Sequence, residues 1–285
     1  MKTIIISDIK GKNESIIPYG LNLAKNLESE VDILPIIDSR SLHGIQSAYS
    51  DSQTIVPGNK MSHEEIVDRE KKHAEMELDK ILSKEASKLN YPLKINTIIE
   101  VGSIESKIKT QVKSNKDCLL LINSAYDDFI FHSGEEILDT IYNMETVSIL
   151  VPPGHDFEEP KNIYLISNPE PKKLSKIKDQ ISFLKPFKPA ITSINVVKPK
   201  NFEKKQLKSN SLEDMMKDRF TPFSFNVKTL AGNKYMEVLM DYVKKSKPDL
   251  MMNLLQRKSL FNNLLQKRRN GKLLGESNVP VLLIK

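Results

Sequence analysis

Short apolar runs alternate with longer amphipathic segments along the first half of the chain. The runs are rich in Ile, Val and Leu, which is typical of strands buried on both faces of a sheet. The segments between them place apolar residues at helical spacing. The expected strands are 2–7, 31–37, 93–100, 117–123 and 147–151, and the expected helices are 15–27, 62–89, 103–114 and 135–142. This alternation predicts an α/β fold with helices on both faces of a parallel sheet.

Local signals mark the start of the longest helix and the segment before it. Ser62 and Glu65 have the spacing of a capping box, so we expect the helix to begin directly after Ser62. Residues 39–60 are polar and contain Pro57-Gly58. This composition predicts a long, mobile loop between the second strand and the helix.

The second half repeats the pattern of the first. KSNKDCLLLIN at 113–123 matches KSKPDLMMNLL, so that Asp117 aligns with Asp249 at an offset of 132 residues, and Gly102 aligns with Gly232 at an offset of 130. The expected strands are 162–167, 190–197, 225–230, 249–254 and 279–284, and the expected helices lie within 171–184, 201–219 and 235–245. The repeat predicts two tandem doubly wound domains, 1–153 and 161–285, with a linker at 154–160.

Composition limits the compartment and the class of protein. The longest apolar runs have about six residues, far fewer than the ~20 that cross a bilayer, and the N-terminal residues lack a signal peptide's apolar core. The single cysteine, Cys118, lies inside an apolar run, so we expect a buried structural thiol and no disulfide. These features favour a cytoplasmic protein without membrane contact.

The net charge of +6 is divided unequally between the halves. Residues 1–155 carry 17 Lys+Arg and 24 Asp+Glu, whereas residues 156–285 carry 26 and 13. Such an asymmetry is typical of a chain whose basic half meets a polyanion or an acidic partner. The simpler interpretation is that the two halves attract each other, within one chain or across a homodimer.

Each half resembles the universal stress protein family, and the whole chain resembles its tandem, two-domain members. In the first half the resemblance rests on KTIIISD, LNLAKNLESEVDILPIID, EVGSIESKI, DCLLLIN and VSILVPP, and in the second on KNIYLIS, AITSINVV, AGNKYMEVL, PDLMMNL and NVPVLLIK. It implies a five-stranded parallel sheet of order 3-2-1-4-5 in each domain. It also implies an internal pseudo-dimer, in which the last strands, 146–151 and 279–284, pair.

Some members of that family bind ATP, and the resemblance implies where such a site would lie. Binders use an Asp after the first strand, backbone at the end of the second, and a Gly-x2-Gly-x9-Gly-Ser/Thr loop after the fourth. In the first half Asp8 and Ile36 occupy the first two positions. The loop pattern falls on Ile122, Ala125, Glu135 and Glu136, and two carboxylates would oppose a triphosphate.

The second half departs further from the pattern. Asn168 replaces the Asp, Val196 marks the end of the second strand, and the loop positions fall on Leu254, Arg257, Lys267 and Arg268. The charge suits phosphate, but bulky side chains stand where glycine backbone would close around it. We therefore expect no cofactor, with ATP as the alternative. The candidate residues of a degenerate nucleotide cleft are Asp8, Ile36, Gly102, Asn123 and Ser133.

Two further clusters have a structural interpretation as well as a functional one. The basic stretch 256–272 could grip nucleic-acid phosphates or an acidic partner, but it is more typical of a solvated helix face. Asp127 and Asp128 near His132 lack further ligands for a metal, so no metal site is expected. The sequence shows no nucleophile paired with a base, so no catalytic residue is predicted.

Three hypotheses follow from these observations. The first is a non-catalytic stress-response module with degenerate nucleotide sites. The second is an adenine-nucleotide binder or slow ATPase that uses the first half. The third is an adaptor that binds a nucleic acid or an acidic protein through its basic second half.

Overall fold

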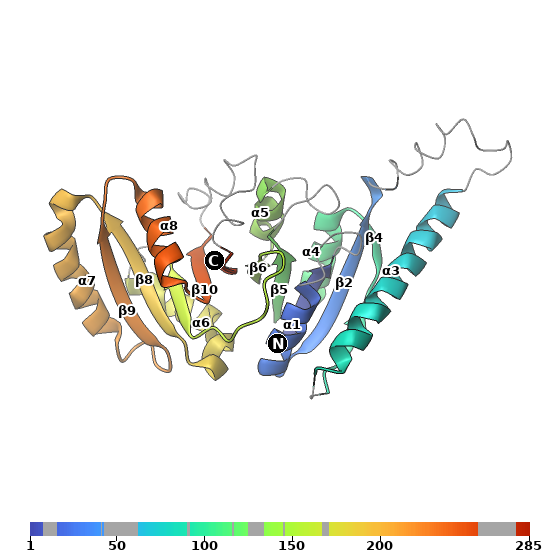
Figure 1. The fold of residues 1–285 in the computed structure, drawn as a ribbon, viewed down its shortest axis with the longest axis horizontal. Coiled ribbons are helices and arrows are strands. Elements are labelled where there is room, and N and C mark those ends of the chain that lie inside the picture. Colours follow the sequence, from blue (N-terminus) through green and yellow to red (C-terminus); the bar gives the residue numbers. More distant parts are fainter. Residues whose placement is uncertain are drawn as a thin grey trace.

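The computed structural model describes residues 1–7, 16–40, 42, 62–89, 92–115, 117–124, 134–144, 146–166, 171–255 and 278–285. Within these residues eleven strands form one continuous sheet, in the order β3-β2-β1-β5-β6-β11-β10-β7-β8-β9, with β4 beside β2. Figure 1 shows helices along the length of the sheet, with α3 (His63–Ala86) at one end and α7 (Phe202–Met216) at the other. The predicted α/β class with tandem parallel sheets is therefore confirmed.

The first half has the predicted strand order 3-2-1-4-5, if β3 and β4 are taken together. Its strands are β1 (Lys2–Ser7), β2 (Glu30–Asp38), β3 (Ile95–Thr97), β4 (Glu100–Gly102), β5 (Cys118–Asn123) and β6 (Val147–Val151). Its helices are α1 (Ile16–Asn26), α3, α4 (Ile104–Ser114) and α5 (Gly134–Tyr142). Each parallel strand returns through a helix, as a sheet of this kind requires.

The prediction of one strand over 93–100 was wrong, because two short strands replace it. β3 pairs with residues 31–33 of β2, and β4 pairs with residues 36–38. The interruption lies opposite Leu34 and Pro35. Because proline has no backbone N–H to donate, a continuous ladder cannot form at this point.

The second half repeats the strand order, with β9 at the outer edge. Its strands are β7 (Asn162–Leu165), β8 (Ala190–Val197), β9 (Ser224–Ala231), β10 (Leu250–Leu254) and β11 (Val281–Ile284), and its helices are α6 (Pro171–Gln180), α7 and α8 (Tyr235–Ser246). The helix expected over 171–184 ends at Gln180 and is followed by a 3-10 helix, Ser182–Phe187. Pro186 explains the change, since its ring disfavours a continuing α-helix.

The two halves join through their last strands, as predicted. β6 and β11 are antiparallel, and Val281, Leu282 and Leu283 pair with Leu150, Ile149 and Ser148. Residues 152–161 connect β6 to β7. The exact domain boundaries stay a prediction, because the sheet runs through both halves without a break.

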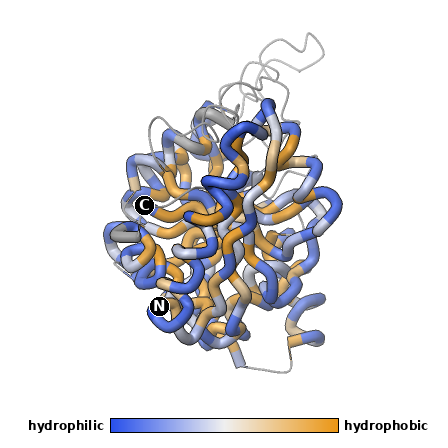
Figure 2. The backbone as a smooth tube through the Cα atoms, turned by 90° about the vertical axis from the view of Figure 1, so that its left-hand side faces the viewer, coloured by the Kyte–Doolittle hydropathy of each residue, from blue (hydrophilic) through white to orange (hydrophobic). Residues whose placement is uncertain are grey.

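Apolar side chains fill both faces of the sheet. The largest buried cluster takes residues from both halves, including Ile5, Ile149, Ile163 and Leu282. A second cluster on the opposite face also spans both halves. Figure 2 shows hydrophobic segments in the interior and hydrophilic ones along the outside. None of the helices within the described ranges is long and apolar enough to cross a membrane.

The capping box that the sequence predicts is present at the start of α3. The Ser62 side chain accepts a hydrogen bond from the Glu65 N–H at 3.2 Å, and the Glu65 carboxylate accepts one from the Ser62 N–H at 2.7 Å. Both bonds satisfy backbone groups that the helix itself leaves without partners.

Replacing Ser62 by alanine should lower the free energy of unfolding by about 1 kcal/mol, because one of these bonds is lost. Ser83→Ala, an exposed change inside the same helix, serves as the matched control and should leave stability unchanged or slightly raised. Urea denaturation of both variants measures the difference. Equal effects from the two changes would show that the cap does not stabilise the helix.

Candidate functional site

A polar cleft lies at the carboxyl edge of the first half of the sheet, where ligands bind in open α/β folds. Its volume is about 520 Å³. The end of β2 and the residues after it form one wall, and the first turn of α4 and one face of α5 form the others. The described lining residues are Asp38, Ser39, Arg40, Ser103, Ile104, Glu105, Glu136, Asp139 and Thr140.

Two carboxylates hold the Arg40 side chain across this cleft. Arg40 donates from Nε to Asp38 Oδ2 at 2.9 Å and from Nη2 to the same oxygen at 2.5 Å, and its backbone N–H donates to Asp38 Oδ1 at 2.7 Å. On the other side, Arg40 Nη1 lies 3.1 Å from Glu136 Oε1. The hydrogen bonds to Asp38, followed by the charge of Glu136, raise the pKa of Arg40 above its ordinary value. The two ion pairs connect the end of β2 to α5.

The charge of the described cleft is negative. Asp38, Glu105, Glu136 and Asp139 contribute four carboxylates, and Arg40 contributes the only described cation. Since the guanidinium is already engaged by two of the carboxylates, it has little capacity left to bind an incoming anion. Two like unit charges about 4 Å apart repel by ~4 kcal/mol at an effective dielectric of 20. With four carboxylates and one guanidinium the described lining has a net formal charge of −3, which disfavours a polyanion.

Three of the predicted site residues lie at this edge of the sheet. Ile36 is buried in β2, two residues before Asp38. Gly102 ends β4 directly opposite Asp38 in the strand register. Its φ of +141° is a conformation that only glycine adopts readily, and it lies where the chain turns from β4 toward α4. Asn123 ends β5 and is buried.

Other residues singled out from the sequence lie outside the described part of the chain. Asp8 and Ser133 lie outside the described residues, as do Ala125 and the candidate metal residues Asp127, Asp128 and His132. In the second half Asn168 and the basic stretch 256–272 also lie outside them. Within the described ranges, no group of three or more His, Cys, Asp or Glu side chains is arranged to hold a metal ion.

Sequence reasoning missed Asp38, Arg40, Glu105 and Asp139 as cleft residues. A signal existed for Asp38, because it directly follows an apolar run and polar residues at strand ends face the ligand edge. Ser39 and Arg40 were instead assigned to a long loop. The structure describes residues 39, 40 and 42 as helical, and the rest of that predicted loop lies outside the described part.

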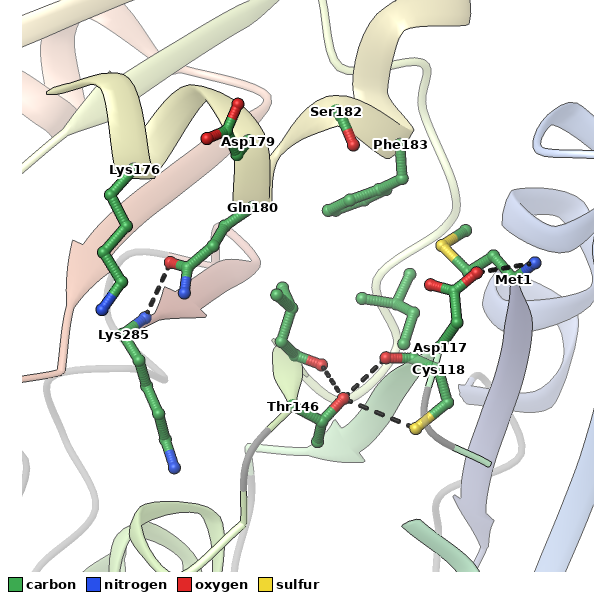
Figure 3. Close-up of a pocket in the computed structure, with 12 residues that line it drawn as sticks. Met1, Asp117, Cys118, Thr146, Lys176, Asp179, Gln180, Ser182, Phe183 and Lys285 are labelled. Atoms are coloured by element: carbon green, nitrogen blue, oxygen red, sulfur yellow. Dashed lines mark hydrogen bonds and ion pairs between the residues drawn. The ribbon is translucent and has the colours of Figure 1, made fainter. Parts of the chain in front are cut away.

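A second cavity, of about 470 Å³, lies between the halves at the opposite edge of the first-half strands. Figure 3 shows residues of α6 and the 3-10 helix on one side and the starts of β1, β5 and β6 on the other. The amino group of Met1 pairs with Asp117 at 3.1 Å, and Lys285 N donates to Gln180 Oε1 at 3.0 Å. Lys285 Nζ donates to the carbonyls of Tyr142 and Met144. Of these contacts, the two that Lys285 Nζ makes with Tyr142 and Met144 join the halves.

Cys118 lies in the wall of this cavity and is a buried thiol, as predicted. Thr146 Oγ1 donates to the Cys118 carbonyl at 2.6 Å and lies 3.5 Å from its Sγ (Figure 3). Burial raises the pKa of the Cys118 thiol above its ordinary value. A reactive cysteine needs a lowered pKa, so the environment of Cys118 supports a structural role.

Known structures share this architecture, although sequence similarity is low. No protein-family model and no curated protein matches the chain. A universal stress protein from Archaeoglobus fulgidus DSM 4304 matches with a TM-score of 0.62 and 12% identity, over 99% of this chain and 96% of that one. A protein of Pseudomonas aeruginosa UCBPP-PA14 assigned to the universal stress proteins matches with a TM-score of 0.55 and 9% identity, over 100% and 93%.

A further similar structure is the cytoplasmic domain of a prokaryotic cation chloride cotransporter, with a TM-score of 0.53 and 10% identity over 99% of this chain and 94% of that one. At these sequence identities the similarity shows a shared fold and does not identify a ligand. The resemblance stated from the sequence is thus supported along nearly the whole chain: this protein has the two-domain fold of the universal stress proteins.

Proposed function

We propose that the protein is a non-catalytic regulatory module of the universal stress type, whose first-half cleft no longer binds a nucleotide. The fold supports the general class. In this proposal the protein acts by binding partners on the surfaces of its two halves. The cleft has a structural role, because its ion pairs connect β2 to α5 beside α4.

The observation that carries the proposal is the position of Arg40 between Asp38 and Glu136. In the alignment that the family resemblance implies, Glu136 falls on the position at which nucleotide-binding members present a hydroxyl to the phosphates. Here its carboxylate lies 3.1 Å from Arg40 Nη1. Binding of a triphosphate would require breaking this pair and burying phosphate charge beside Glu105 and Asp139, which also line the cleft. Uncompensated charge of this kind is costly to bring together.

An adenine-nucleotide binder or slow ATPase remains the second candidate, because one feature of the cleft favours an anion. The cleft includes the first turn of α4, where Ser103 makes no side-chain capping bond. A helix N-terminus presents backbone N–H groups to an anion. Asp8 and Gly102 are the further residues on which this candidate depends.

Nucleotide content and thermal stability distinguish the two candidates. Protein purified without added nucleotide should release no ATP, ADP or AMP when it is denatured and its small molecules are separated by chromatography. Millimolar ATP with Mg²⁺ should leave the melting temperature unchanged. A ligand at about 100 times its dissociation constant adds about 2.7 kcal/mol to the free energy of unfolding. A change of that size raises the melting temperature by several degrees. Released nucleotide, or a shift of that size, would support the second candidate instead.

A further inference from the structure

The amino edge of the second half of the sheet carries an unusual concentration of positive charge. Parallel strands begin at this edge, and the helices that connect them end there. The described basic residues in these turns, here called the basic edge, are Lys161, Lys176, Lys178, Lys185, Lys188, Lys217, Arg219, Lys244, Lys245 and Lys247. The acidic residues of these turns and of the last helical turns before them are Glu158, Glu159, Asp179, Glu213, Asp214, Asp218 and Asp249, so the ten basic residues leave a formal charge of +3.

The chain order explains how these residues gather. Lys161 precedes β7, Lys188 precedes β8, Lys217 and Arg219 precede β9, and Lys247 precedes β10. The strand order β10-β7-β8-β9 places these turns side by side, in the lower left part of Figure 1. Neighbouring strands lie about 4.8 Å apart. The turns that carry these charges, although distant in sequence, therefore lie next to one another.

None of these ten side chains forms an ion pair with another described residue. Nine are exposed, and Lys178, half-buried, donates to the Arg219 carbonyl at 2.6 Å. Asp249 does not neutralise a lysine side chain, because its carboxylate accepts the backbone N–H groups of Lys161 and Asn162 at 2.9 and 2.7 Å. The positive charge is thus available to a partner.

The first half supplies an internal comparison, since it has the same fold and the same edge. There the basic groups at the strand starts are paired: Lys94 lies 2.7 Å from Glu30, Lys2 lies 3.0 Å from Asp32, and the Met1 amino group lies 3.1 Å from Asp117. Lys25, Lys84 and Lys113, in the last turns of α1, α3 and α4, form no ion pair with another described residue. Lysines near helix C-termini are favoured by the helix dipole in any such fold. Because the dipole acts equally in both halves, it does not explain why the basic groups at the strand starts have carboxylate partners in the first half and none among the described residues in the second.

The chemistry of the basic edge fits a phosphate backbone better than a protein surface. Protein interfaces are depleted in lysine and enriched in aromatic residues. The exposed large apolar residues of the described chain are Met1, Met76, Leu207 and Met215, of which Met215, in the last turn of α7, lies next to the basic edge. Phe183 and Phe187, the nearest ring-bearing residues of the 3-10 helix, pack against the core. Stacking on single-stranded bases therefore has no platform here.

We propose that the basic edge binds the backbone of duplex nucleic acid without reading its sequence. Nine of its ten residues are lysines, which contact phosphate as point charges, whereas base recognition relies chiefly on bidentate side chains such as Arg. This binding surface lies away from the first-half cleft and does not depend on whether that cleft holds a nucleotide. It also differs from the stretch 256–272, which follows β10 at the opposite edge of the sheet.

Two variants with the same change in net charge test the proposal. The edge variant replaces Lys185, Lys217, Lys244 and Lys245 by glutamine. The control variant replaces Lys198, Lys200, Lys204 and Lys208, which are exposed near the start of α7. Thermal melting first shows that both variants fold. Binding to a mixed-sequence DNA duplex is then measured by fluorescence anisotropy at several salt concentrations.

The wild-type protein should bind the duplex at low salt, with affinity falling by about 10³ or more between 50 and 200 mM salt if six or more phosphates are contacted. The edge variant should bind at least about tenfold more weakly, and its salt slope should fall by up to about one unit per lysine removed. The control variant should keep the wild-type slope. Equal losses in both variants, or no duplex binding at low salt, would overturn the proposal. So would edge-dependent binding to phosphatidylserine vesicles without binding to the duplex.

Discussion

Replacing Asp32 by alanine is expected to lower the free energy of unfolding by about 3–5 kcal/mol, the usual cost of removing one member of a buried ion pair. The Asp32 side chain is 2% exposed. Its carboxylate accepts hydrogen bonds from Lys2 Nζ at 3.0 Å, Asn96 Nδ2 at 2.9 Å and Gln111 Nε2 at 2.7 Å. Alanine would leave all three donors without this acceptor inside the fold.

The effect should be specific to the buried carboxylate. Glu30 is a matched control from the same strand, because it also pairs with lysines but is 44% exposed. Glu30→Ala should cost far less, since exposed ion pairs contribute little to stability. Urea denaturation of the two variants gives the comparison. Similar losses for both would mean that the hydrogen-bonded cluster around Asp32 does not stabilise the first half.

Leu282→Ala should lower the free energy of unfolding by about 2–5 kcal/mol, the range for removing a buried leucine side chain. Leu282 is fully buried, lies opposite Ile149 across the β6–β11 pair, and belongs to the core cluster that both halves share. Because the sheet and this cluster run through the junction, both halves should lose stability together.

Differential scanning calorimetry measures whether the two halves lose stability together. The variant should melt in one transition at a lower temperature than the wild-type protein. Leu207→Ala is the control, since Leu207 is 69% exposed on α7, and it should leave the transition nearly unchanged. Two separate transitions, with only the second half shifted by Leu282→Ala, would contradict the idea of one cooperative sheet.

The sequence was sufficient for the fold where apolar runs end at clear polar breaks. Residues 2–7, 147–151 and 190–197 were predicted as strands, and the structure gives β1, β6 and β8 these bounds. It was insufficient where a partner strand decides the outcome. The interruption between β3 and β4 depends on Pro35 in the neighbouring strand, which periodicity within 93–100 does not contain.

The order of strands and the family resemblance predicted the edge of the sheet at which the cleft lies, but not the residues that line it. Ile36, Gly102 and Asn123 lie at this edge and are not among the described lining residues. The ion pair between Arg40 and Glu136 joins residues almost one hundred positions apart, and only the packing of α5 against the end of β2 brings them together. Likewise, composition revealed a basic second half, but the strand order was needed to gather Lys161, Lys188 and Lys247 at one edge.

The affinity of the wild-type protein for ATP with Mg²⁺ tests the central claim most directly. Isothermal titration calorimetry should show no saturable binding, corresponding to a dissociation constant weaker than about 1 mM, which is a binding free energy of about −4 kcal/mol. The Arg40 pairs with Asp38 and Glu136 would then remain intact in the presence of nucleotide. Saturable binding of one ATP with a micromolar dissociation constant would contradict the claim that this cleft does not bind a nucleotide.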